Sequence, residues 1–196
     1  GLQHLDLVEA FDARIVTGGI RLLFLEPRIA FVQAARARPV ARQQHDLRHE
    51  IEIVPADERA AETARAARVE VAMPDDPNSE GWVKRIAQLQ PDFLFSFYYR
   101  HMLSEQLLAT AKYGALNMHG SLLPKYRGRA PVNWAIIHGE AQTGASLHYM
   151  EARPDAGPLV GQAVDAILPN DTAPDVSLKV AAAAERLLDQ HLPDLI

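Results

Sequence analysis

The sequence LNMHGSLLPKYRGRAPVNW, from Leu116 to Trp134, decides the expected fold and the expected site of this chain. An apolar run ends here in Asn117 and His119, and a long loop rich in glycine, proline and basic residues follows. Side chains at positions i and i+2 of a strand point to the same face of the sheet. We therefore expect the carboxamide of Asn117 and the imidazole of His119 to face one space at the end of a strand.

Asp155 is the third candidate for this site, and it lies in a second loop, Arg-Pro-Asp-Ala-Gly. The trio suits acyl chemistry, because an amide can stabilise an oxyanion, a histidine can move a proton and a carboxylate can tune the histidine. A free imidazole has a pKa of about 6.5, and an adjacent carboxylate is expected to raise it. From the residues alone, structural roles for all three side chains stay open, such as a turn at Asp155.

Two longer motifs accompany the trio. SFYYRHM, from Ser96 to Met102, and HGSLLPKYRGRAPVNW, from His119 to Trp134, resemble the signature of the folate-dependent formyltransferases. These enzymes move a formyl group from 10-formyltetrahydrofolate to an amine. Within that family the chain is most similar to the UDP-4-amino-4-deoxy-L-arabinose formyltransferases, which form one domain of the bifunctional polymyxin-resistance proteins. The resemblance extends over about residues 69–196.

The resemblance implies an α/β fold, namely the three-layer, Rossmann-like formyltransferase fold with a mostly parallel sheet. It implies catalytic roles for Asn117, His119 and Asp155, with no metal. It also implies that 10-formyltetrahydrofolate is the formyl donor. The residues expected to line the donor site are His101, Met102, Leu103, Arg129, Glu151, Ala152, Arg153, Pro154 and Asp155. By their charge alone, Arg127 and Arg129 suit either solvated loop positions or contacts to carboxylate and diphosphate groups.

The leading hypothesis is an N-formyltransferase acting on the amine of a UDP-linked aminosugar, UDP-4-amino-4-deoxy-L-arabinose. Such an activity implies a role in lipid A modification and in polymyxin resistance. A methionyl-tRNA formyltransferase is one alternative, although that branch resembles His-Ala-Ser-Leu-Leu-Pro and Arg-Gly-Ala-Ala-Pro where this chain has Gly120 and Arg129. Glycinamide ribonucleotide formyltransferases usually have proline where Gly120 stands. A non-catalytic folate-binding fragment also stays open, because no N-terminal strand–turn–helix unit is recognisable.

Composition limits the remaining possibilities. The 196 residues suffice for a domain with a sizeable core, and 48% of them are hydrophobic. A formal net charge of −5 argues against non-specific nucleic-acid binding. The chain has no cysteine, which excludes disulfides and thiol nucleophiles and fits a cytoplasmic protein. We expect no membrane span and no signal peptide. A homo-oligomer, or a fused dehydrogenase domain as in full-length relatives, stays open.

The first sixty residues do not follow the pattern of the family. We interpret residues 1–60 as a divergent or frame-shifted segment, with an unfamiliar N-terminal extension as the alternative, and residues 61–196 as an incomplete catalytic domain. The start at Gly1 suggests a fragment or a processed form. Within this segment the weak patterns favour strands at 13–17 and 22–25 and a helix at 29–37.

From residue 51 on, strand and helix patterns alternate, as in an α/β sheet covered on both faces. Ser104 is expected to cap a helix, and Trp134 to be a core or packing aromatic. Leu178, Val180, Ala181, Leu187 and Leu188 are expected to be buried on the last helix. His138, His148 and His191 have no metal-ligand spacing with acidic partners, so we expect no metal site. We expect strands at 51–54, 69–73, 93–97, 115–118, 143–150 and 159–167, and helices at 57–67, 80–89, 105–111, 131–138 and 175–191.

Overall fold

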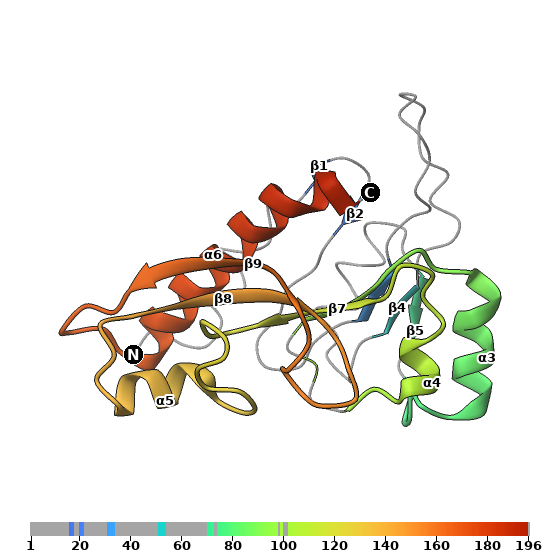
Figure 1. Ribbon diagram of the computed structural model, residues 1–196, viewed down its shortest axis with the longest axis horizontal. Helices are drawn as coiled ribbons and strands as arrows, with labels where there is room; N and C mark the ends of the chain where they lie inside the picture. The colour runs from blue at the N-terminus through green and yellow to red at the C-terminus, as the bar shows by residue number, and fades with distance from the viewer. Residues whose placement is uncertain are drawn as a thin grey trace. The chain divides into compact units, whose positions relative to one another are not determined.

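The computed structural model shows two compact units, residues 1–116 with residue 196, and residues 117–195 (Figure 1). The residues that the structure describes are 74–97, 99 and 102–195, together with the strand segments 16–17, 20–21, 31–33, 51–53 and 70–72. The expected helix at 57–67 and most of the segment 1–60 lie outside these residues.

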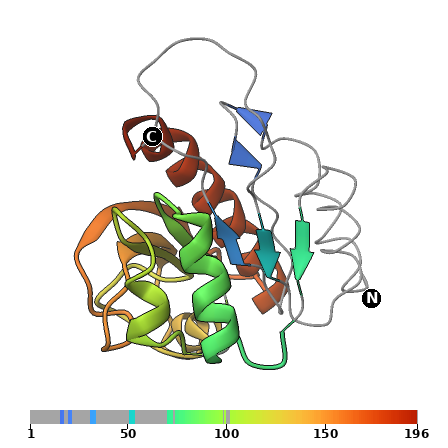
Figure 2. The same ribbon diagram turned by 90° about the vertical axis from the view of Figure 1, so that its right-hand side faces the viewer.

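The first unit contains two groups of strands. In one, β1 (Val16–Thr17) pairs antiparallel with β2 (Ile20–Arg21). In the other, the strand order is β5-β4-β3-β6, with bounds Glu70–Ala72, Ile51–Ile53, Phe31–Gln33 and Leu94–Phe97. The short strands β4 and β5 are parallel and lie side by side in Figure 2, whereas β3 runs antiparallel to both β4 and β6.

The expectation of a helix at 29–37 is wrong, because β3 occupies Phe31–Gln33. Phe31 and Val32 are residue types that suit a pleated, paired surface. Their backbones pair with Ile53 and Glu52 of β4 on one side and with β6 on the other. Pairing on both sides outweighs the weak helical preference of the alanine- and arginine-rich sequence that follows.

Among the described residues of the first unit, one helix has the expected bounds and a second begins where expected but ends three residues earlier. Helix α3 spans Glu80–Leu89, and α4 spans Glu105–Leu108. Ser104 caps α4 as predicted, since its hydroxyl accepts a hydrogen bond from Leu107 N at 3.2 Å. Strand β6 is buried along its whole length, which confirms the prediction of a strand covered on both faces.

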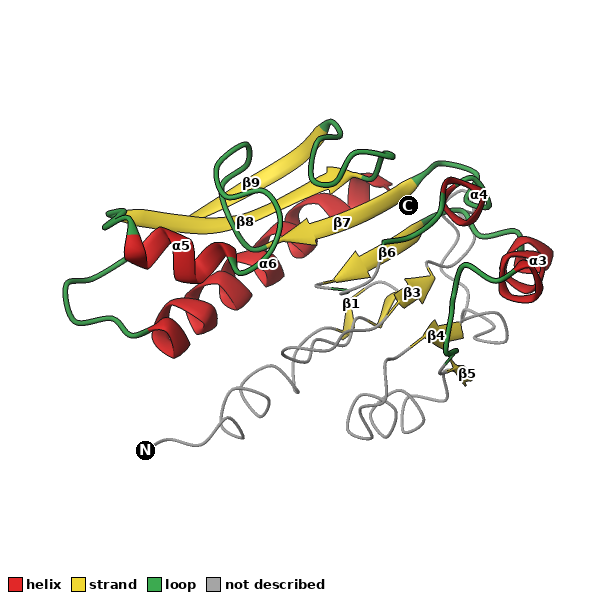
Figure 3. Cartoon of the chain, turned by 90° about the horizontal axis from the view of Figure 1, so that it is seen from below, coloured by secondary structure: helices red, strands yellow, loops and turns green. Residues whose placement is uncertain are grey.

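The second unit is a three-stranded arrangement with the order β7-β8-β9. Strand β7 (Ala115–His119) crosses the unit boundary; β8 (Gln142–Tyr149) and β9 (Leu159–Ala166) form an antiparallel pair. Helices α5 (Pro131–Ile137) and α6 (Ala173–Leu195) lie on one side of β8 and β9 (Figure 3). The α/β class expected from the sequence is confirmed, with antiparallel pairs at β3 and at β8–β9.

Helix α6 supplies much of the core of this unit. Its buried residues recur every three or four positions and so form one face: Val176, Val180, Ala183, Ala184, Leu187, Leu188 and Leu192. The prediction for Leu178 is wrong, because that residue lies two positions from Val176, on the other side of the helix, and is 37% exposed. Of the two roles expected for Trp134, the structure shows packing and not burial in the core, because the residue is 48% exposed and its ring packs against that of His138.

At Gly144 of β8, the backbone lies very close to the backbone of the neighbouring strand β9. A Cβ atom there would overlap the carbonyl group of Ala163 and come within 2.9 Å of Leu122 Cδ2. We expect Gly144→Ala to lower the free energy of unfolding by about 3 kcal/mol, because a backbone carbonyl cannot move aside cheaply. Denaturant unfolding would measure this change in the free energy of unfolding. Gly81→Ala, in α3 with nothing within 4 Å, is the control and should raise stability slightly. Equal stability of the two variants would contradict the packing described here.

Candidate active site

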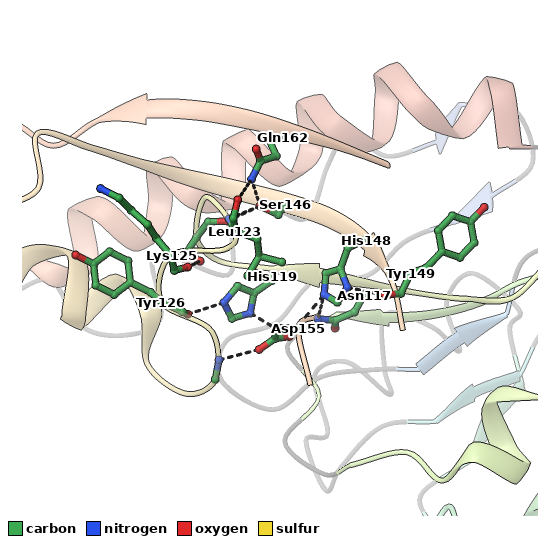
Figure 4. A network of polar contacts seen from close by, with 12 residues as sticks. Asn117, His119, Leu123, Lys125, Tyr126, Ser146, His148, Tyr149, Asp155 and Gln162 are labelled. Carbon is green, nitrogen blue, oxygen red and sulfur yellow. Dashed lines mark hydrogen bonds and ion pairs between the residues drawn. The ribbon is translucent and has the colours of Figure 1, made fainter. Parts of the chain in front are cut away.

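The candidate site begins at the end of β7. Asn117 and His119 share one face of the strand, while the intervening Met118 is buried on the opposite face, only 1% exposed. His119 is itself 6% exposed. Figure 4 shows the side chains of Asn117, His119, His148 and Asp155 gathered together.

Both ring nitrogens of His119 face protein groups. Nε2 lies 2.8 Å from the carbonyl oxygen of Tyr126. Because a carbonyl can only accept, Nε2 carries the hydrogen and donates it. Nδ1 lies 3.6 Å from Oδ1 of Asp155, so in the neutral ring the nitrogen with the lone pair faces the carboxylate.

Asp155 is fixed by its backbone and by a neighbouring loop. Its φ angle of 51° lies in the left-handed region, which aspartate tolerates better than most residues. The amide of Gly128 donates to Oδ2 at 2.8 Å. Burial acts to raise the pKa of Asp155, but contact with His148, the charge of His119 and the Gly128 amide together bring that pKa below its ordinary value. The side chain is therefore a carboxylate at neutral pH.

His148 is a further residue of the site, and no sequence motif indicated it. Its Nδ1 donates to the carbonyl of Tyr149 at 2.7 Å, so in the neutral ring Nε2 accepts from Nδ2 of Asn117 at 3.1 Å. The same Nε2 lies 3.6 Å from Oδ1 of Asp155. One carboxylate oxygen is thus flanked by two imidazole rings. The sequence does contain a signal for this residue. Polar residues stand at alternate positions near the end of β8, at Ser146 and His148, and so share the face of the strand that carries the site.

The pKa of His119 differs from the sequence-based expectation. Asp155 and the Tyr126 carbonyl do act to raise it, but burial has the largest effect and holds the pKa of His119 below its ordinary value. The expected effect of the carboxylate is therefore present, but the larger effect of burial outweighs it. His119 is neutral at pH 7 and able to accept a proton.

The loop after β7 is held against β8 by a buried hydrogen-bond network, part of which appears in Figure 4. The Ser146 hydroxyl donates to the carbonyl of Ser121 at 2.6 Å and accepts from Leu123 N at 3.0 Å. Gln162 of β9 donates to the Leu123 carbonyl at 2.9 Å and to the Ser146 hydroxyl at 2.8 Å. These contacts fix the first half of the loop that supplies the Tyr126 carbonyl and the Gly128 amide to the site.

The residues expected to bind the donor are distributed over both units. Met102 and Leu103 belong to the first unit, and His101 lies outside the described residues. In the second unit, the loop 151–155 is tied to the loop after β7 by the bond from Gly128 to Asp155. The remaining expected donor-site residues of this unit are exposed, and they are Arg129, Glu151, Ala152, Arg153 and Pro154.

A comparison with protein families decides the class of this chain. Residues 32–192 match the family described as Formyl transferase. The chain belongs to the formyl transferase family. This family generally uses 10-formyltetrahydrofolate, and the matched range includes both loops of the site.

Solved structures agree with this formyl transferase fold. A phosphoribosylglycinamide formyltransferase from Streptococcus pneumoniae superposes with a TM-score of 0.65 at 21% identity, over 71% of this chain and 82% of that chain. The corresponding protein from Bacillus halodurans gives 0.66 at 25% identity, over 74% and 78%. A sugar N-formyltransferase from a Shewanella species gives 0.59 at 24% identity. That match covers 68% of this chain but only 51% of the Shewanella protein.

Two further properties of this formyl transferase concern membranes and metals. Within the part of the chain that the structure describes, no helix combines the length and apolarity needed to cross a membrane. Among the same residues there is no group of three or more histidine, cysteine, aspartate or glutamate side chains that could hold a metal ion.

Proposed function

We propose that this chain transfers the formyl group of 10-formyltetrahydrofolate to the amine of a UDP-linked aminosugar, UDP-4-amino-4-deoxy-L-arabinose, and so serves lipid A modification and polymyxin resistance. The observation that carries the chemical part is the convergence of Asn117, His119 and Asp155. These residues come from two segments far apart in sequence. His119 and His148 flank one carboxylate oxygen of Asp155, and Asn117 bonds to His148.

The reaction forms one carbon–nitrogen bond and breaks another. The acceptor amine attacks the formyl carbon, and its proton passes to Nδ1 of His119, beside the Asp155 carboxylate that stabilises the imidazolium. The carbonyl oxygen becomes an oxyanion. A carboxamide NH2 has two donor hydrogens, and the contact with His148 uses one, so Asn117 has a second for the oxyanion. As the bond to the folate nitrogen breaks, the proton on His119 passes to that leaving nitrogen.

The acceptor is proposed from the sequence motifs and the charge of the loops. The long motif from His119 to Trp134 resembles the sugar-nucleotide branch. Arg127, Arg129 and Arg153 are exposed on the two loops that carry the Tyr126 carbonyl and Asp155. Guanidinium groups suit a diphosphate. A phosphoribosylglycinamide acceptor is the second candidate, because two of the structural neighbours described above carry that name.

A competition assay tests this proposal. Purified chain and 10-formyltetrahydrofolate would be offered UDP-4-amino-4-deoxy-L-arabinose, glycinamide ribonucleotide or initiator methionyl-tRNA, and the formylated product identified by mass spectrometry. We expect the highest kcat/KM with the aminosugar nucleotide. Preferential formylation of glycinamide ribonucleotide would support the second candidate. Binding of the folate without formylation of any acceptor would indicate a non-catalytic chain.

The pH dependence of kcat/KM should report His119. The neutral ring is the form that accepts the proton, and burial holds the pKa of His119 below its ordinary value of 6.5. The free enzyme should therefore stay active on lowering the pH through neutrality and lose activity only below pH 6.5, as His119 becomes protonated. A profile whose acidic limb lies above that value, measured with saturating donor, would contradict this assignment.

A further inference from the structure

The carbonyl that binds His119 belongs to a residue with an unusual backbone. Tyr126 has a φ angle of 56°, in the left-handed region. This conformation is unfavourable for a bulky aromatic residue and persists only where the surroundings hold it. The same residue presents its carbonyl oxygen to Nε2 of His119 at 2.8 Å. Whatever holds Tyr126 in place therefore also holds the hydrogen-bond partner of the proposed base.

The side chain of Tyr126 is held at the end of α5. Its hydroxyl donates to Oε1 of Glu140 at 2.7 Å and accepts from Nδ1 of His138 at 3.2 Å. Glu140 is fixed in turn, because its backbone amide donates to the carbonyl of Ala135 at 3.0 Å. Lys125 Nζ donates to both carboxylate oxygens of Glu140, at 2.8 and 2.9 Å. We call Lys125, Tyr126 and Glu140 the loop clamp.

The loop clamp bears on which nitrogen of His119 carries the proton. Neutral histidine has two tautomers, and the hydrogen bond at one nitrogen determines which tautomer is present. The Tyr126 carbonyl requires a hydrogen on Nε2. Without that acceptor, the Asp155 carboxylate 3.6 Å from Nδ1 would favour a hydrogen there instead. The lone pair would then move to Nε2, away from the carboxylate that stabilises the imidazolium.

We propose that Tyr126 and Glu140 are positioning residues that select the Nε2–H tautomer of His119. This inference rests on the formyl transfer proposed above for its consequence in catalysis, but the tautomer itself is a property of the protein without substrates. Tyr126 acts through its backbone carbonyl, and Glu140 acts by accepting the Tyr126 hydroxyl.

The test measures the ring nitrogens of His119 by NMR in the substrate-free chain, labelled with nitrogen-15 in histidine. The chemical shift distinguishes a protonated ring nitrogen from one with a lone pair. Four variants are compared with the unaltered chain. Tyr126→Phe removes only the hydroxyl, Glu140→Ala removes the acceptor, and Glu140→Gln keeps an acceptor but loses the charge. Asp165→Ala is the control, because it removes an acidic partner of Arg186 at 2.6 Å elsewhere in the same unit.

We expect the Nε2–H tautomer in the unaltered chain, in Glu140→Gln and in Asp165→Ala. Tyr126→Phe and Glu140→Ala should shift the population towards Nδ1–H and lower kcat by about 10-fold, with a smaller change in KM. An Nδ1–H tautomer in the unaltered chain would overturn the proposal, and this outcome can be measured even if no variant folds. It is equally overturned by an unchanged tautomer in folded Tyr126→Phe, or by a Glu140→Gln that behaves like Glu140→Ala. Absence of formyl transfer in the unaltered chain would refute the proposed function and leave the tautomer measurement as it stands.

Discussion

Replacing His119 by alanine should lower kcat for formyl transfer by about 10³-fold, because the reaction loses the group that takes the amine proton and returns it to the leaving nitrogen. The residue is buried at the end of β7, and a methyl group there can neither hold a proton nor bond to the Tyr126 carbonyl. Steady-state kinetics with saturating donor and acceptor would measure the loss. KM should change much less than kcat, because the lost interaction belongs to the transition state.

His191→Ala is the matched control for that substitution. His191 belongs to α6 and lies against Gly161 of β9, so its loss removes packing without removing a group from the site. We expect a lower melting temperature and an unchanged kcat. Comparable loss of kcat in the two variants would show that His119 acts through stability and not through proton transfer.

Asp155→Asn should lower kcat by about 10²-fold, since the variant keeps the shape of the side chain but loses the charge that stabilises the imidazolium of His119. The Gly128 amide would still find an oxygen acceptor, so the loop should keep its conformation. Kinetics over a range of pH would measure both rate and protonation.

Asp155→Asn should also shift the pH dependence of kcat/KM in a defined direction. The carboxylate acts to raise the pKa of His119 against the larger effect of burial. Without the carboxylate, burial lowers the pKa of His119 further. The acidic limb of the pH profile of kcat/KM should therefore move to lower pH. Asp165→Asn, at an exposed ion pair with Arg186, should change neither the rate nor the limb. An acidic limb that moves to higher pH in Asp155→Asn would contradict the electrostatic account of the pair.

The sequence predicted the strands and helices of residues 80–195 closely, because each element there has a regular pattern and clear end signals. Ser104 before α4 and the proline that begins α5 are such signals. The errors came where tertiary contacts decide. Strand β3 forms just before an alanine- and arginine-rich segment because strands pair with it on both sides, and no local period shows this.

The site was predictable in part. The spacing of Asn117 and His119 in a strand was sufficient to place both on one face. Asp155 is 36 residues from His119 in the sequence, and only the motif resemblance linked them. The left-handed backbone of Asp155 and the Gly128 amide that orient the carboxylate are properties of loop conformation. His148 escaped notice because a histidine in a buried strand is usually structural, and the burial that lowers the pKa of His119 is known only from the folded chain.

The most direct test of the account is a single-turnover experiment with 10-formyltetrahydrofolate that carries carbon-13 in its formyl group. The enzyme is used in excess with UDP-4-amino-4-deoxy-L-arabinose, and the label is followed by NMR in the unaltered chain and in a variant with Asn117, His119 and Asp155 all changed to alanine. The account predicts that the label moves from the folate to the aminosugar nitrogen in the unaltered chain and stays on the folate in the variant. Transfer at the same rate by both proteins would contradict it.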